Sequence, residues 1–336
     1  MRVIIDAMGG DNAPEAIVRG AVMAKRRLGV DVTLVGIEER VRECLRNEDC
    51  DDIDVVNASE VITMEDDPST ATRHKKDSSM TVALNMLRDG EGDAVVSAGS
   101  TGALLTGATL IVKRIHGIRR AALAPVFPAG EHGVMLIDCG ANVECTPEYL
   151  LQFAYMGSFY AEKVMGCEKP KVGLLNVGTE DTKGGSLQHE AFALLKKADS
   201  EGRISFAGNI EGTDVFTGKV DVVVTDGFTG NVLLKTTEGV IKFMGKAFKG
   251  VFFKSFKNKL AALVLKKDIG IMKKSFDVNE VGGTALVGIS KPVVKAHGSS
   301  GAESLFSAVR QAIAFKNAGI IEDIEKNIDY MKLTED

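Results

Sequence analysis

Six short turns that are rich in glycine and polar side chains are the part of the sequence best suited to chemistry. Each follows an apolar segment and places Asp, Asn, Ser or Thr beside at least one Gly. Glycine lets a backbone turn tightly or approach a ligand closely, and the polar neighbours offer hydrogen bonds to it. The six turns are residues 6–11 (DAMGGD), 97–103 (SAGSTGA), 138–142 (DCGAN), 176–180 (NVGTE), 226–231 (DGFTGN) and 297–304 (HGSSGAES).

The repetition of this design predicts that the turns converge on one anionic ligand. In a parallel sheet they lie at the carboxyl ends of the strands, where open α/β folds bind ligands. Several also open a helix, whose free N–H groups favour an anion. The alternative is that Gly only lets a strand turn into a helix that the polar residues cap. Capping accounts for any single turn, but convergence accounts better for all six.

The segments between the turns predict an α/β fold. Short runs rich in Val, Ile and Leu alternate with longer segments of helical period, as is typical of βαβ units and a mainly parallel sheet. No linker divides the chain, so we expect one catalytic domain over residues 1–336. The expected strands are residues 3–6, 32–36, 53–57, 94–97, 123–127, 134–138, 172–176, 204–207, 222–225, 285–289 and 293–296. The expected helices are residues 14–28, 80–88, 103–115, 147–165, 186–198, 232–248 and 302–317.

Composition limits the functional class. The chain is 45% hydrophobic and 26% charged, which is ordinary for a globular protein. Its net charge of −5 argues against a general nucleic-acid binder. No apolar run is long enough to span a bilayer and no signal peptide is visible, so we expect a cytoplasmic protein. The five cysteines have no CxxC spacing, which supports neither a disulfide framework nor a zinc site.

Known cofactor and nucleophile motifs are missing from the sequence. No GxGxxG follows the first predicted strand, and no Gly-Lys pair is followed by the Ser or Thr of a P-loop. There is no GxSxG, and His189-Glu190 lacks the second His of HExxH. We therefore expect no nucleotide, no metal and no other cofactor.

In their order along the chain, these turns resemble those of the phosphate acyltransferases of the PlsX family. The matching motifs are DAMGGD, SAGSTGA, DCGAN, NVGTE with the following Lys183-Gly184, DVVVTDGFTGN and KAHGSS, so the resemblance extends from residue 6 to residue 304. It implies a three-layer α/β/α sandwich like that of phosphotransacetylases and isopropylmalate dehydrogenases, and a homodimer. One position departs from the family pattern, since Ser100 stands where Asn is expected.

The resemblance also implies an activity. A long-chain fatty acyl group passes reversibly from acyl-[acyl carrier protein] to inorganic phosphate. The acyl phosphate then supplies a membrane glycerol-3-phosphate acyltransferase in phospholipid synthesis.

Such a reaction needs positioning and oxyanion stabilisation more than a strong base, because the thioester is already activated. We expect a cation to neutralise the phosphate, with Lys183 as the first candidate and Lys295 as the second. His297 is the candidate acid for the leaving thiolate, although it equally fits a residue that only caps or packs. The residues expected to bind phosphate or substrate are Gly9, Gly10, Asp11, Ser97, Gly99, Ser100, Thr101, Gly102, Asp138, Asn142, Asp226, Asn231, Ser299 and Ser300.

A basic, amphipathic helical segment is expected at residues 242–274. Residues 242–267 contain eight Lys and no acidic residue. Lysines beside exposed aromatics indicate reversible attachment to an anionic membrane surface, and a helix buried between subunits with a lysine rim is the alternative. A second basic patch, residues 113–120, is a candidate dock for the acidic carrier protein. The residues expected to contact membrane or carrier protein are Phe248, Phe252, Phe253, Lys254, Phe256, Lys257, Leu260 and Leu263.

Three other functions are alternatives to this one. A phosphotransacetylase that uses acyl-CoA shares the fold and the reaction type, and the turns do not distinguish the donor. A noncatalytic membrane-surface scaffold gives the glycine turns no role. A β-decarboxylating dehydrogenase needs nicotinamide and a cluster of metal-binding carboxylates, which the sequence does not show.

Overall fold

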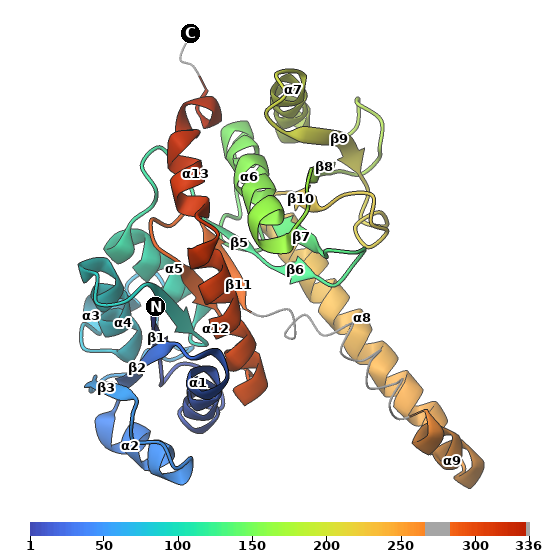
Figure 1. Cartoon of the computed structure of the whole chain (residues 1–336). Helices are drawn as coiled ribbons and strands as arrows, with labels where there is room; N and C mark the ends of the chain where they lie inside the picture. The colour runs from blue at the N-terminus through green and yellow to red at the C-terminus, as the bar shows by residue number, and fades with distance from the viewer. Residues whose placement is uncertain (266–282, 334–336) are drawn as a thin grey trace.

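The computed structural model describes residues 1–265 and 283–333, and their strands form two sheets (Figure 1). Neighbouring strands are parallel, except where β11 pairs with its neighbours and where β6 pairs with β7. The seven-stranded sheet has the order β3 (Asp54–Asn57), β2 (Asp31–Gly36), β1 (Arg2–Asp6), β4 (Ala94–Ser97), β12 (Val293–Lys295), β11 (Thr284–Val287) and β5 (Ala122–Ala124). The five-stranded sheet has the order β6 (Val126–Phe127), β7 (Val134–Ile137), β10 (Val222–Val224), β8 (Lys171–Leu175) and β9 (Ser205–Ile210).

Helices surround both sheets. They are α1 (Glu15–Leu28), α2 (Glu38–Asn47), α3 (Ala71–His74), α4 (Ser79–Asp89), α5 (Thr101–Gly107), α6 (Pro147–Tyr160), α7 (Ser186–Ser200), α8 (Gly227–Phe253), α9 (Phe256–Val264), α12 (Ala302–Asn317) and α13 (Ile320–Lys326). Two π-helical turns, η1 (Ala108–Val112) and η2 (Ala161–Met165), continue α5 and α6, and a 3-10 helix, η3 (Ile328–Met331), follows α13.

The first sheet is the middle layer of an α/β/α sandwich. Val3 and Ile5 of β1 share a buried cluster with residues of α1 and α12, whereas Ile4 packs with residues of α4. Successive side chains of a strand point to opposite faces, so the consecutive buried apolar residues of β1 require helices on both sides. The expected mainly parallel α/β architecture is confirmed, and the strands are divided between two sheets.

The second sheet is also covered on both faces. Met135 and Ile137 of β7 pack with residues of α6 and α7. Leu136 belongs to the opposite cluster, against which Leu233 and Leu234 of α8 pack. The first turns of α8 are therefore fixed to the second sheet.

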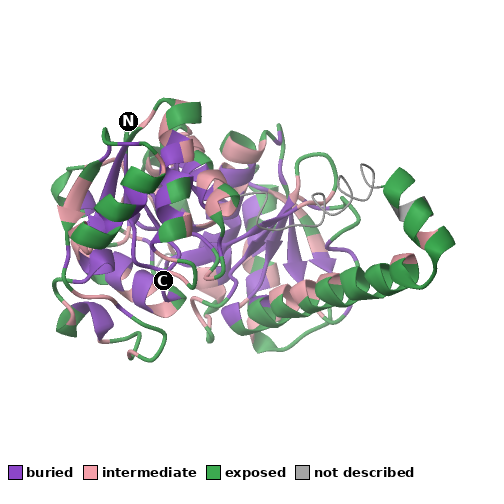
Figure 2. Cartoon of the chain, turned by 90° about the horizontal axis from the view of Figure 1, so that it is seen from below, coloured by how far each residue is buried: buried purple, intermediate pink, exposed green. Residues whose placement is uncertain are grey.

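Helix α8 begins in the protein body and then leaves it. Asp226 caps its first turn by accepting a hydrogen bond from the backbone N–H of Thr229 at 2.8 Å. From residue 242 to the end of α8, all side chains except Phe252 are exposed, and the helix projects from the body together with α9 (Figures 1 and 2). Within the described parts of the chain, no helix is both long and apolar enough to cross a membrane. Residues 266–274 of the expected basic segment lie outside the described residues.

The predicted strand at residues 123–127 is divided by Pro125 into β5 and β6, which belong to different sheets. Proline has no N–H for a ladder hydrogen bond, so the chain passes from one sheet to the other at this residue. Helix α2 was not predicted, although Val41, Cys44 and Leu45 form its buried face at helical spacing.

Glycine substitutions in α8 test how its first turn packs. A Cβ atom at Gly230 would lie 1.9 Å from the carbonyl oxygen of Asp138, whereas one at Gly239 would meet no atom within 4 Å. We expect Gly230→Ala to lower the free energy of unfolding by about 1–3 kcal/mol through overpacking. The matched variant Gly239→Ala should raise it by up to about 1 kcal/mol, because Ala has the higher helix propensity. Denaturant unfolding followed by circular dichroism measures both, and equal stabilities would contradict this packing.

Candidate functional site

Three turns of the first sheet are packed against one another. The backbone N–H of Asp11 donates to the carbonyl of Gly298 at 2.8 Å, and the side-chain amide of Asn12 donates to the carbonyl of Ser299 at 3.1 Å. Gly9 is required here because a Cβ atom would lie 2.6 Å from the backbone N of Gly99. Three of the six turns, residues 6–11, 97–103 and 297–304, therefore pack together.

Two of the predicted phosphate ligands in these turns are used to brace them. The Ser97 hydroxyl donates to Oδ2 of Asp6 at 2.6 Å, and the same hydroxyl accepts the backbone N–H of Gly99 at 3.0 Å. All three groups are buried, and burial raises the pKa of Asp6 above its usual value. Ser97 and the N–H of Gly99 are thus committed to the turn.

Lys295 ends β12 beside this cluster and is buried, with only 7% of its surface exposed. Its ammonium group donates to the carbonyl of Ala98 at 3.3 Å and also to the carbonyl of Ala296. Burial lowers the pKa of Lys295 to about 8, against the opposing effect of the carboxylates of Asp6 and Asp11. The structure therefore places a cation with a perturbed pKa where the three turns meet.

His297 points its ring into the same region. The backbone N–H of Ser299 donates to Nδ1 of His297 at 3.2 Å, and the Ser299 hydroxyl lies 2.9 Å from this nitrogen. A ring nitrogen that accepts a hydrogen bond has no proton, so the neutral ring has its proton on Nε2. Partial burial lowers the pKa of His297 and favours this neutral form. Its Nε2–H is available as a donor to a ligand.

Two turns of the second sheet form another packed group. Both carboxylate oxygens of Asp138 are used, since they accept the backbone N–H groups of Leu123 at 2.9 Å and of Asn142 at 2.7 Å. The side chain of Asn142 donates to Asp138 and to the carbonyl of Ala121. The backbone N–H of Gly227 donates to the carbonyl of Asn142 and joins the start of α8 to this turn. Asp138, Asn142 and the cap Asp226 thus hold the backbone rather than reach into open space.

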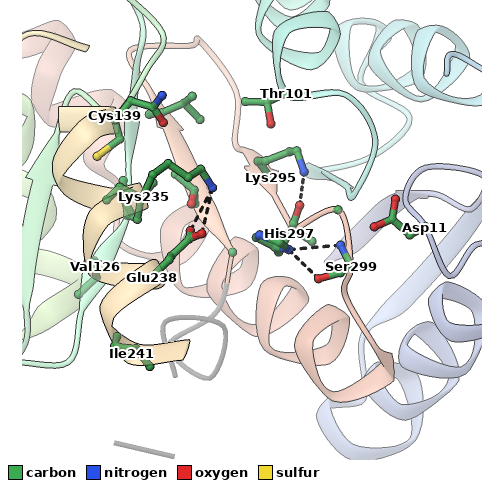
Figure 3. A pocket seen from close by; sticks show the side chains of 18 of the residues that line it. Asp11, Thr101, Val126, Cys139, Lys235, Glu238, Ile241, Lys295, His297 and Ser299 are labelled. Carbon is green, nitrogen blue, oxygen red and sulfur yellow. Dashed lines mark hydrogen bonds and ion pairs between the residues drawn. The ribbon is translucent and has the colours of Figure 1, made fainter. Parts of the chain in front are cut away.

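A cavity of about 590 Å³ lies between the two groups of turns. Residues of β12 and of the loops after β1, β4 and β12 line one side, and α8 with residues 123–126 lines the other (Figure 3). Of the residues expected to bind or react, those that line this cavity are Asp11, Thr101, Asn231, Lys295, His297 and Ser299.

Sequence reasoning missed the wall that α8 contributes. Lys235, Glu238 and Lys242 line the cavity together with Asn231. These positions follow Asn231 by 4, 7 and 11 residues, which is the spacing of one helix face. The signal was therefore present in the sequence, as a polar stripe on the helix that follows the DGFTGN turn.

Lys183, the first candidate cation, does not line this cavity. Its ammonium lies 3.9 Å from a carboxylate oxygen of Glu180, and about half of its side chain is exposed. The neighbouring Gly184 and Gly185 line a second cavity of about 310 Å³ together with Asn176 and Thr229. The turn at residues 176–180 thus lines the second cavity, beside Thr229 of the 226–231 turn, and does not line the first.

The remaining expected ligands occupy supporting positions. Ser100 caps α5 by accepting the backbone N–H of Ala103 at 3.5 Å, and a Cβ atom at Gly102 would meet Pro68 at 2.7 Å. Ser300 is buried, and its hydroxyl has no hydrogen-bond partner among the described residues. Gly10 has a φ of +104°, which suits glycine, and packs against the carbonyl of Gly298. Across residues 1–265 and 283–333, no group of three or more His, Cys, Asp or Glu side chains could hold a metal ion.

The chain is similar to known proteins over nearly its whole length. The family described as "Fatty acid synthesis protein" matches residues 1–323. A phosphate acyltransferase from Oceanobacillus iheyensis is 47% identical over 313 residues, which is 93% of this chain and 92% of that protein. A phosphate acyltransferase from Geobacillus sp. is 47% identical over 331 residues, which is 98% of this chain and 99% of that protein.

Solved structures share the fold. A phosphotransacetylase from Streptococcus pyogenes aligns with a TM-score of 0.66 at 18% identity, over 96% of this chain and 94% of that one. The EutD phosphotransacetylase from Staphylococcus aureus aligns with a TM-score of 0.62 at 17% identity, with the same coverage. At these identities the likeness extends to the fold alone.

The buried position of Lys295 predicts how stability depends on pH. Its pKa is about 8 in the folded chain and near 10.5 when unfolded, so the unfolded chain binds more protons between these values. Stability should then rise with pH across this range relative to a Lys295→Met variant, by up to about 3 kcal/mol. Parallel denaturant titrations from pH 7 to pH 10 measure this difference, with the exposed Lys249→Met as the control. Identical pH slopes for wild type and Lys295→Met would contradict the burial of this charge.

Proposed function

The chain belongs to the family of phosphate acyltransferases, and from this premise we propose that it transfers a long-chain fatty acyl group from acyl carrier protein to inorganic phosphate. Acyl transfer to phosphate is the activity named for relatives that match over nearly the whole chain. The carrier protein as donor is our proposal, based on the resemblance of the six turns. Residues from both sheets line the cavity, so the proposal treats residues 1–336 as one catalytic unit.

The observation that best supports this reaction is the chemistry of the cavity walls. Lys235, Lys242 and Lys295 line it together with the hydroxyls of Thr101 and Ser299. Cations and hydroxyls suit a phosphate group. Apolar side chains also line the cavity, and these suit an acyl chain; they are Leu123, Val126, Leu234 and Ile241.

In the proposed mechanism, a phosphate oxygen attacks the carbonyl carbon of the thioester. The C–S bond breaks as the new C–O bond forms, and the carrier thiolate leaves and takes up the proton that the attacking hydrogen phosphate loses. The ammonium of Lys295 balances the charge of the phosphate, and Nε2–H of His297 donates to the oxygen or sulfur that gains charge. A neutral imidazole suits this role because it donates a hydrogen bond without having to lose its proton.

The projecting end of α8 and α9 supports membrane attachment as a further part of the proposal. Phe253, Phe256 and Leu263 are each more than 60% exposed and lie near Lys254 and Lys257. Aromatic and aliphatic side chains among lysines suit an anionic bilayer surface. Attachment there would bring the acyl phosphate to a membrane glycerol-3-phosphate acyltransferase. A homodimer, with α8 packed against a second subunit, is the alternative for the same surface, and residues 113–120 are a candidate dock for the carrier protein.

The activity is tested by mixing palmitoyl-[acyl carrier protein], phosphate and the protein without metal or nucleotide and detecting acyl phosphate. We expect product, and we expect His297→Ala to lower kcat by roughly 100-fold, as for removal of one oxyanion donor. Lys183→Ala measures the contribution of the first candidate cation. Product from palmitoyl-CoA alone would favour the phosphotransacetylase alternative. Full turnover by both variants would contradict the catalytic roles predicted for His297 and Lys183.

Membrane attachment is tested by sedimentation with vesicles. We expect wild-type protein to sediment with vesicles that contain anionic lipid and the triple variant Phe253→Ser, Phe256→Ser, Leu263→Ser to stay in the supernatant, because burial of these side chains drives insertion. Val177→Ser is the matched control, since Val177 is at least as exposed as these three side chains but lies in the loop after β8. A triple variant that still binds vesicles but is monomeric would support the dimer helix instead.

A further inference from the structure

Lys235 lines the cavity but belongs to none of the six glycine turns. Its ammonium nitrogen lies 3.2 Å and 3.1 Å from the two carboxylate oxygens of Glu238, which is three residues further along α8. Both side chains point into the cavity, opposite Lys295 and His297 (Figure 3). Because Leu233 and Leu234 pack α8 against the second sheet, this wall has a defined position relative to the turns.

The charges of the cavity are unbalanced. Its lining contains Lys235, Lys242 and Lys295, but only the carboxylates of Asp11 and Glu238. The positive charge of Lys235 adds to the effect of burial in lowering the pKa of both Lys295 and His297, so it acts on the two groups across the cavity. Cations that repel one another across an aqueous space are stabilised by an anion that enters between them.

We propose that Lys235 is a catalytic residue that binds the phosphate group directly, from the side of the cavity opposite Lys295. The two ammonium groups then hold the phosphate of the substrate, and later that of the acyl phosphate, between the two sheets. Lys235 is suited to this because it lines the cavity, more than half of its side chain is exposed, and its partner is a single carboxylate on its own helix. The proposal rests on phosphate being the acyl acceptor, as proposed above.

The other lysines fit this role less well. Lys183 lies beside Glu180, in the loop that borders the second cavity. Lys242 is seven residues beyond Lys235, which places it about 10 Å further along the helix axis, towards the exposed end of α8. Lys235 is the lysine of α8 that lies nearest to Asn231 and the packed turns.

The test is steady-state kinetics with acyl-[acyl carrier protein] and varied phosphate. We expect Lys235→Met to raise the KM for phosphate by about 10- to 100-fold, as for loss of one charge-assisted hydrogen bond, with a much smaller change in the KM for the acyl donor. Lys235→Arg should recover part of the loss. Calorimetric titration with inorganic phosphate alone should show the same weakening without turnover.

One complication is that Lys235→Met leaves Glu238 unpaired, and its carboxylate would repel phosphate. The double variant Lys235→Met, Glu238→Gln removes that repulsion and keeps the net charge of the cavity. If Lys235 binds phosphate, the KM for phosphate stays high in the double variant. If it returns to the wild-type value, Lys235 only neutralises Glu238, and the proposal is wrong.

The control is Lys326→Met on α13, which removes a lysine with the same three-residue spacing from its carboxylate partner, Asp323. It should leave the KM for phosphate unchanged. That result would show that loss of a helix ion pair is not by itself the cause of the raised KM in Lys235→Met. A wild-type protein without phosphate-dependent turnover would contradict the proposed function itself. A wild type that turns over, with Lys235→Met indistinguishable from it, would contradict this inference alone.

Discussion

The burial of the Lys295 side chain is the constraint to which the arrangement of the first sheet's turns is adapted. A charge removed from water is costly unless oxygen atoms replace its hydration. Here the carbonyls of Ala98 and Ala296 do so, and Asp6 and Asp11 supply negative charge nearby. Carbonyls can approach the ammonium only if the loops pack closely, and closely packed loops in turn require Gly9 and Gly10. The glycines and the lysine are therefore parts of one constraint.

Helix α8 connects this constraint to the rest of the molecule. Its first turn is locked to the backbone of Asp138 and its next turns to the second sheet, while its polar stripe faces Lys295 and His297. Its far end leaves the body and exposes apolar side chains among lysines. Helix α8 thus runs from the proposed phosphate site to the start of the proposed membrane contact, which continues in α9.

The sequence predicted the strands well because each is a short apolar run, and six of the eleven predicted strands end in a glycine turn. It also predicted that all six turns converge, whereas residues of only five of them line the first cavity, three turns from the first sheet and two from the second. It did not predict which polar groups remain free. Asn142 and Ser97 are residue types that can bind an anion, but their hydrogen bonds are used within the turns. Lys235 was missed because its role depends on which face of α8 meets the cavity, and that is decided by packing on the second sheet.

Some polar side chains of the turns hold the backbone and others remain free to bind a ligand. This difference explains why Ser100 is acceptable where the family pattern has Asn. The side chain of Ser100 caps α5 and is buried, so its position contributes to local backbone structure more than to an open binding surface. Ser and Asn are both strong N-cap residues, since each offers a side-chain oxygen to a free N–H of the first turn. In the proposed site, recognition of phosphate falls to side chains that line the cavity, such as Thr101, Lys295 and Lys235. A substitution within a turn motif is tolerated when it preserves the cap, whereas one on the cavity wall would change the chemistry.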